Sequence, residues 1–107
     1  SLDTTFNWGK DGIVWTMAVQ SDWKILVGGS FDELIGEPRS NIGRLNADGS
    51  LDTAFDPGVE NGTAAAWVDT VAIQSDGEVV VGGHFSELDG QPSDYIGRLD
   101  PNGTFIN

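Results

Sequence analysis

The sequence predicts an all-β fold made of two copies of one unit of about 54 residues. The stretch "AVQSD" followed by "VGGSF" returns as "AIQSD" followed by "VGGHF", so that Val27 aligns with Val81. Self-similarity at a fixed period is the signature of repeat architectures. The segments between turn signals are short and rich in β-branched residues, and none carries an apolar helical period long enough for a stable helix. We therefore expect four short strands in each unit.

The repeat describes a single domain, 1–107, of two units. We place unit 1 at about 1–49 and unit 2 at about 50–103, with part of a next strand at 104–107. Just over half of the positions in the matching core of the two units are identical. Unit 2 carries extra residues rich in Gly, Ala and Asn after "SLDTAF", which predicts a longer surface loop there.

The strands follow from the apolar pattern of each unit. The first strand alternates apolar and polar residues and ends at a Ser-Asp turn. The second is a near-continuous apolar run, which is typical of a strand buried on both faces. The expected strands of the two units are 14–20 and 68–74, 24–31 and 78–85, 41–46 and 95–100, and 50–55 with its counterpart 1–6.

Glycine pairs interrupt the second strand of each unit, at Gly28, Gly29, Gly82 and Gly83. A glycine inside a buried strand marks the close approach of a neighbouring backbone or a large ring. A phosphate-binding loop would need a helix after the glycines, and neither unit supplies one. We therefore predict a packing role for all four glycines.

The turns between strands contain glycine where a left-handed backbone is needed, as in "NADGS", "DPNGT" and "QSDGE". In unit 1 the counterpart of "QSDGE" is "QSDWK", so Trp23 occupies the glycine position. A bulky residue at positive φ is strained. Either this turn is remodelled, or Trp23 is kept for a contact that offsets the strain.

The motifs "DGSLDTAFDPG", "VAIQSDGEVVVGGHF" and "IGRLD" resemble the delta-60 repeat, and the resemblance covers essentially the whole chain. It implies one four-stranded antiparallel β-propeller blade per unit, in a family of large, mostly bacterial proteins that are often secreted or displayed on the surface. An extracellular or cell-surface location is expected from this resemblance alone. It implies no catalytic residues.

Two blades do not close a propeller, because typical rings contain four to eight. The blades are therefore expected to be completed by adjoining repeats or by copies of the chain, in a closed ring or a filament. We predict that 1–7 adds as a strand to another chain, head to tail, with Phe6 and Trp8 as anchors.

The composition limits the partners. Five Lys and Arg residues against 17 Asp and Glu residues give a net charge of −12, which disfavours nucleic acids and anionic membrane surfaces. No apolar run approaches the roughly 20 residues of a membrane span, so membrane insertion is not expected. The chain has no cysteine, and we expect no cofactor.

One loop has a weak likeness to a calcium site, with Asn46, Asp48 and Asp52 as oxygen donors. Arg44 falls on the first ligand position of that loop, and a cation there opposes metal binding. We therefore predict a turn and no metal. Arg44 and its counterpart Arg98 are expected to pair with nearby Asp side chains or carbonyls.

Enzymatic groups are not expected. His84 is matched by Ser30 in unit 1, which favours a structural role. Glu33 and Glu87 recur at the repeat period, and we interpret them as partners of a loop in each blade rather than as a catalytic carboxylate pair.

The four tryptophans lie where the units differ, so the packing rules of the repeat do not explain them. They are Trp8, Trp15, Trp23 and Trp67. Three roles stay open: capping the core, forming an interface, or stacking on a ligand such as a glycan. The expected function is a non-enzymatic scaffold that binds itself or adjoining repeats. The alternative is a carbohydrate-binding propeller, and a calcium-stabilised adhesin module is more remote.

Overall fold

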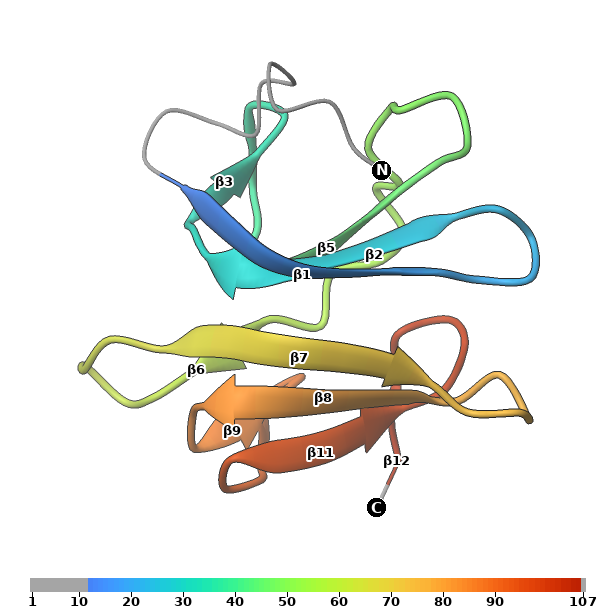
Figure 1. Ribbon diagram of the computed structural model, residues 1–107. Coiled ribbons are helices and arrows are strands. Elements are labelled where there is room, and N and C mark those ends of the chain that lie inside the picture. The colour runs from blue at the N-terminus through green and yellow to red at the C-terminus, as the bar shows by residue number, and fades with distance from the viewer. Residues whose placement is uncertain (1–11, 107) are drawn as a thin grey trace.

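The computed structural model describes residues 12–106 of the chain, and these residues form strands and turns without a helix (Figure 1). The all-β prediction is confirmed. The strands, in chain order, are β1 (Ile13–Val19), β2 (Ile25–Ser30), β3 (Glu33–Leu34), β4 (Glu37–Pro38), β5 (Ile42–Leu45), β6 (Val59–Glu60), β7 (Trp67–Ile73), β8 (Val79–His84), β9 (Glu87–Leu88), β10 (Gln91–Pro92), β11 (Ile96–Leu99) and β12 (Phe105–Ile106). Within the described part of the chain, no helix is present that could cross a membrane.

Two antiparallel sheets lie one above the other and form the body of the molecule (Figure 1). We call the sheet of order β1-β2-β5 blade 1, and the sheet of order β7-β8-β11-β12 blade 2. The first three expected strands of each unit are present, with each end shifted by one residue. Blade 2 also has the expected fourth strand, because β12 pairs with β11.

The fourth strand expected in blade 1 at 50–55 is wrong. Only Leu51 pairs there, in a single bridge to Leu45. The chain then turns, with the N–H of Phe55 bonded to the carbonyl of Asp52 at 3.2 Å. This turn carries Phe55 into the core between the blades, where its side chain is fully buried. Burial of a large ring between the sheets replaces further pairing along the edge of blade 1.

Two small hairpins, β3–β4 and β9–β10, were not expected as strands. Their two-residue turns hold Ile35 and Gly36 in one hairpin, and Asp89 and Gly90 in the other, all at positive φ. This is the backbone of a type I′ turn, which suits the twist of paired strands. The Asp89-Gly90 dipeptide is the sequence signal that indicates such a turn.

The glycine pairs lie opposite a β-bulge in the first strand of each blade. Between Val14 and Thr16 the pairing of β1 with β2 skips Trp15, and in blade 2 it skips Asp69 in the same way. A Cβ placed on Gly29 would fall on the carbonyl oxygen of Ile13, and on Gly83 it would fall on that of Trp67. The bulge brings a backbone so close that only glycine fits.

Each blade has two faces, because side chains alternate along a strand. The front face of blade 2 includes Val68, Val71 and Ile73, and it packs on the back face of blade 1, which includes Leu26, Gly28, Ile42 and Arg44. The counterparts in the repeat are Val14, Met17 and Val19 on the front face of blade 1, and Val80, Gly82, Ile96 and Arg98 on the back face of blade 2. The largest buried cluster fills the interface between the blades.

Candidate functional site

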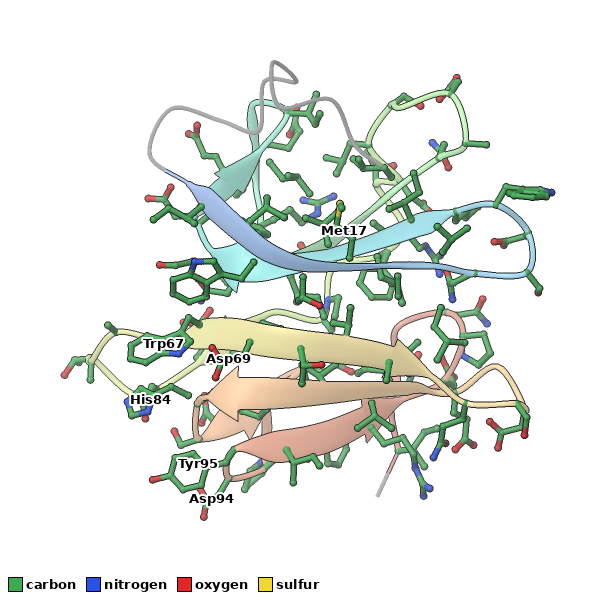
Figure 2. The ribbon with its side chains drawn as sticks, in the orientation of Figure 1. Met17, Trp67, Asp69, His84, Asp94 and Tyr95 are labelled. Carbon is green, nitrogen blue, oxygen red and sulfur yellow. The ribbon has the colours of Figure 1, made fainter. Side chains whose placement is uncertain are left out.

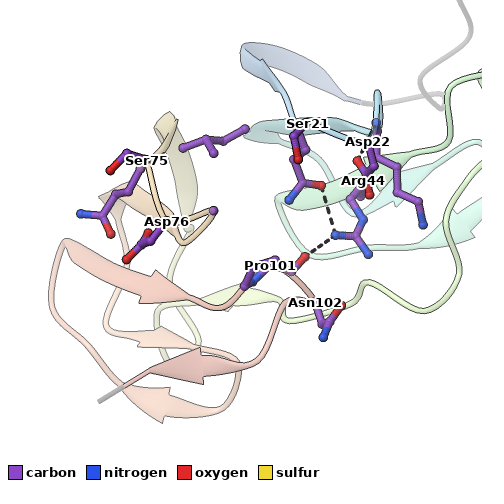
Figure 3. A pocket seen from close by; sticks show the side chains of 12 residues that line it. Ser21, Asp22, Arg44, Ser75, Asp76, Pro101 and Asn102 are labelled. Carbon is purple, nitrogen blue, oxygen red and sulfur yellow. Dashed lines mark hydrogen bonds between the residues drawn. The ribbon is translucent and has the colours of Figure 1, made fainter.

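Arg44 joins the two blades at the end where the β1–β2, β7–β8 and β11–β12 turns meet (Figure 3). Its Nη1 donates to the carbonyl of Pro101 in blade 2 at 2.6 Å and to Oε1 of Gln20 at 3.1 Å. Its Nε donates to Oδ2 of Asp52 at 2.9 Å. The guanidinium carbon also lies 4.6 Å from the centre of the Phe55 ring. Arg44 thus holds a carbonyl of one blade to a carboxylate of the other.

Asp52 is the carboxylate on which this arrangement depends. Burial favours its neutral form and would raise its pKa, but hydrogen bonds from Lys24, from the backbone N–H of Ala54 and from Arg44, with the charge of Arg44, outweigh burial. The pKa of Asp52 is therefore lowered from 3.8. Lys24 Nζ lies 2.9 Å from Oδ2, the same oxygen that Arg44 contacts. Asp52 is a charged anchor for two cations.

A polar pocket of about 420 Å³ opens beside Arg44 (Figure 3). The two "QSD" turns of the repeat face each other across it, so that Ser21 and Asp22 come from blade 1 and Ser75 and Asp76 from blade 2. Asp22 accepts a hydrogen bond from the N–H of Lys24, and Asp76 accepts one from the N–H of Glu78. Both carboxylates therefore stabilise their own turns.

The back face of blade 2 is open where the back face of blade 1 is covered. Ile42 is fully buried between the blades, whereas its counterpart Ile96 is 63% exposed. The side chain of Arg44 is 6% exposed, whereas that of Arg98 is 45% exposed. A pocket of about 440 Å³ lies on this open face, and the residues lining it are Gln74, Val80, Pro92, Ser93, Ile96, Gly97, Arg98, Phe105 and Ile106.

The front face of blade 1 also exposes apolar side chains. Met17 is 41% exposed, and it points away from blade 2 (Figure 2). Its counterpart Val71 is 6% exposed because it packs against blade 1. Val19 is 57% exposed. The interface between the blades pairs a back face with a front face. The other back face, on blade 2, and the other front face, on blade 1, are both exposed.

Aromatic side chains form a row at the end of the molecule that carries the bulges (Figure 2). The rings of Trp67 and His84 stack with their centres 4.4 Å apart. The Trp15 ring packs edge-on against Trp67 at 6.2 Å, and the Tyr95 ring lies tilted 6.2 Å from His84. In blade 1 the counterparts of Trp67, His84 and Tyr95 are Ile13, Ser30 and Asn41, so these three rings are a feature of blade 2. Trp15 extends the row from blade 1.

The structure separates the predicted tryptophans. Trp15 and Trp67 touch, but Trp23 lies in the β1–β2 turn at the opposite end of the strands. Trp23 has a φ of 70° and is 72% exposed. Its turn is not remodelled, because it repeats the hydrogen bonds of the turn at Gly77. Trp8 and Phe6 lie outside the described residues.

The residues of the calcium-like loop are used in other contacts. Asp48 accepts hydrogen bonds from the N–H and the hydroxyl of Ser50, which lower its pKa. Asn46 donates to the Ser50 hydroxyl at 3.0 Å, and Asp52 pairs with Arg44. Among the described residues, no group of three or more His, Cys, Asp or Glu side chains could hold a metal ion.

Sequence reasoning missed the role of Asn41 and its counterpart Tyr95. Asn41 donates to the carbonyl of Val59 and accepts from the N–H of Phe31, both at 3.0 Å. It thereby ties blade 1 to the segment that leads into blade 2. Both positions have positive φ, which Asn tolerates and Tyr does not. The mismatch of Asn with Tyr in the aligned units was the available signal.

A family model described as a domain of unknown function (DUF5122), beta-propeller, matches residues 20–55 and 74–105. These two stretches make up more than half of the chain, and the first lies mostly in unit 1 and the second mostly in unit 2. No curated protein matches the chain. No solved structure matches it either.

Proposed function

Because the chain belongs to the DUF5122 β-propeller family, whose function is unknown, we propose that it is a non-enzymatic scaffold whose two outer faces bind further blades. The observation that carries the proposal is the match between the open back face of blade 2 and the covered back face of blade 1. Ile96 and Arg98 stand where Ile42 and Arg44 stand in the interface. A surface that already packs against a blade inside the chain is suited to receive another blade.

The repeat motifs support a proposal about where this scaffold is located and how it assembles. We identify the units with the delta-60 repeat on the motifs "QSDGEVVVGGHF" and "IGRLD". On that resemblance alone, we propose that the scaffold lies outside the cell or on its surface. Further blades come either from adjoining repeats or from copies of the chain, and head-to-tail contacts then close a ring or extend a filament.

Strand addition by 1–7, with Phe6 and Trp8, stays a prediction, because these residues lie outside the described part of the chain. The edge beside β11 already holds β12, which is two residues long. A strand donated by another chain would therefore have to extend the sheet of blade 2 beyond β12. Contact between faces requires no free edge, and it is the form of assembly that the exposed side chains support.

Light scattering across a range of protein concentrations tests the scaffold proposal. We expect discrete oligomers or growing filaments, and a return to monomers in Ile96→Asp, because a charge on the back face opposes burial there. Glu37→Gln, at an exposed position of β4, is the control and should assemble like the parent. A parent that stays monomeric at every concentration contradicts assembly by copies of this chain.

The aromatic row supports a second candidate, a carbohydrate-binding propeller. Exposed rings can stack on the apolar face of a sugar, and carboxylates accept hydrogen bonds from its hydroxyls. Asp69 and Asp94 lie beside the labelled ring residues in Figure 2. Tyr95 has a positive φ, which is unfavourable for a tyrosine, and its side chain is 63% exposed. Burial of the ring in this chain therefore does not offset the backbone strain.

The repeat itself supplies matched variants for the glycan test. Tyr95→Asn and Trp67→Ile place the blade 1 residue in blade 2, so folding should survive. If the row binds sugars, neutral oligosaccharides should quench tryptophan fluorescence in the parent and not in the double variant. Trp23→Gly, at the other end, should bind like the parent. The absence of saturable quenching by an oligosaccharide panel contradicts this second candidate.

A further inference from the structure

We infer that a second copy of this chain docks the front face of its blade 1 on the back face of blade 2, and that Arg98 then donates to the carbonyl of Ala47 in that copy. This inference rests on the proposed scaffold function. It follows from applying the contact between blades 1 and 2 once more, with each residue replaced by its counterpart. Arg44 becomes Arg98, and Pro101 becomes Ala47.

The apolar part of the proposed contact would form between Gly82 on the back face of blade 2 and Val14 on the front face of the second copy. A Cβ at Gly28 would lie 2.6 Å from Cγ1 of Val68, so the glycine makes room for the valine of the next blade. The counterpart pair is Gly82 and Val14. Among residues 12–106, a Cβ at Gly82 would meet only Thr70 and the carbonyl of Tyr95 within 4 Å, and no side chain of a following blade. The docked copy would place its Val14 there.

The exposed side chains on the two faces then cover one another. Met17 and Val19 of the second copy take the positions of Val71 and Ile73, which contribute to the core between blades 1 and 2. They would lie against Val80 and Ile96, the counterparts of Leu26 and Ile42. Docking therefore buries the most exposed apolar residues of both β1 and β11.

The polar half keeps its arginine and its glutamine. Gln74 is the counterpart of Gln20, and it lines the same pocket as Arg98. In blade 1, Gln20 accepts a hydrogen bond from the arginine that reaches across the interface. Gln74 is placed to orient Arg98 in the same way.

The carboxylate that pairs with the arginine comes from a different sequence position in each unit. Ile106 stands where Asp52 would be expected, so Arg98 lacks that anchor. Glu78 stands where Lys24 would be, and its Oε1 lies 3.3 Å from Nε of Arg98. Each arginine therefore has one carboxylate at its Nε, although the two carboxylates come from different positions. Docking would bury an ion pair instead of a lone cation.

The acceptor in the second copy is presented like the one that Arg44 uses. The turn at Ala47 closes with the N–H of Gly49 bonded to the carbonyl of Asn46 at 2.9 Å. The turn at Pro101 closes with the N–H of Gly103 bonded to the carbonyl of Asp100 at 3.0 Å. Ala47 is an exposed residue.

The test mixes two variants that each lack one face. Met17→Asp damages the front face, and Ile96→Asp damages the back face. We expect each variant alone to be monomeric and an equal mixture to form a dimer of twice the chain mass, because one intact front face then meets one intact back face. Dimers of Met17→Asp alone would indicate back-to-back contact and overturn the inference. If Met17→Asp does not fold, Val19→Asp replaces it.

Arg98 is then tested inside that mixture. Adding Arg98→Met to the Met17→Asp variant should weaken the mixed dimer by about 10- to 150-fold, the loss expected for a hydrogen bond to a charged group. Adding Glu37→Gln instead should change nothing. A mixed dimer of unchanged affinity refutes the role of Arg98 and leaves the scaffold proposal standing. A mixture that remains monomeric refutes both docking by copies and the role of Arg98.

Discussion

Trp23 has a strained backbone conformation that its side-chain contacts do not explain. Its backbone has the left-handed conformation of Gly77 in the other unit, and its ring is mostly exposed. The same turn hydrogen bonds form in both units, so the fold does not need the tryptophan. Within the described part of the chain, no contact of the Trp23 ring compensates for this backbone strain.

We therefore predict that Trp23→Gly stabilises the monomer. A non-glycine residue in the left-handed region costs roughly 1–2 kcal/mol, of which the greater chain entropy of glycine returns part. The net gain should be up to about 1 kcal/mol, measured by urea unfolding. Gly77→Ala is the mirror control and should destabilise. A loss of stability in Trp23→Gly would mean that the ring makes a contact on which the fold depends.

Asp52 makes the free energy of unfolding depend on pH in the acidic range. Its pKa in the folded protein is lowered, so its stabilising effect is complete above about pH 4 and is lost as the pH falls through the lowered pKa. Asp52→Asn should lower stability at pH 7 and flatten the decline in acid. Thermal melts from pH 7 to pH 2 provide the measurement. Asp48→Asn, which removes an exposed carboxylate, should change the profile much less. An unchanged decline in Asp52→Asn would show that other carboxylates control it.

At the scale of the strand, the glycine pair and the bulge form one device. The bulge adds a residue to the first strand, and the glycines of the second strand admit the displaced backbone. The sequence could predict the close approach, because glycine is unusual in a buried strand. It could not predict the bulge, because Trp15 and Asp69 share no chemistry that marks an extra residue.

This device predicts a sharp sensitivity to the smallest side chain. Gly29→Ala and Gly83→Ala should each destabilise by about 1–3 kcal/mol or more, since the new methyl group would fall on a backbone carbonyl. Gly90→Asn is the matched control, because Asn tolerates positive φ and no atom of the described residues lies within 4 Å of a Cβ there. Chemical unfolding measures the three variants. Unfolding of Gly29→Ala at the same denaturant concentration as the parent would contradict the close packing.

The fourth strand shows where sequence reasoning stopped. "SLDTAF" has strand composition, yet only Leu51 pairs, because Phe55 is drawn between the blades and Asp52 binds Arg44. The packing of Phe55 depends on residues of blade 2 that are distant in sequence, and the pairing of Asp52 with Arg44 depends on how the chain turns after β5. The same limit applies to the candidate site. The repeat period located Arg44 and Arg98, but only the packed blades show that one is covered and the other open.

At the scale of the whole molecule, the two equivalent arginines should differ in their effect on folding. Arg44→Met removes the contact with Pro101 and takes one of its two cations from the buried Asp52, so we expect a loss of about 3–5 kcal/mol. Arg98→Met removes an exposed pair and should cost less than about 1 kcal/mol. Urea unfolding at a concentration where the chain is monomeric measures both. Equal losses would mean that the back face of blade 2 is already covered in solution, and the contrast between one filled and one open interface, on which the assembly argument depends, would then be wrong.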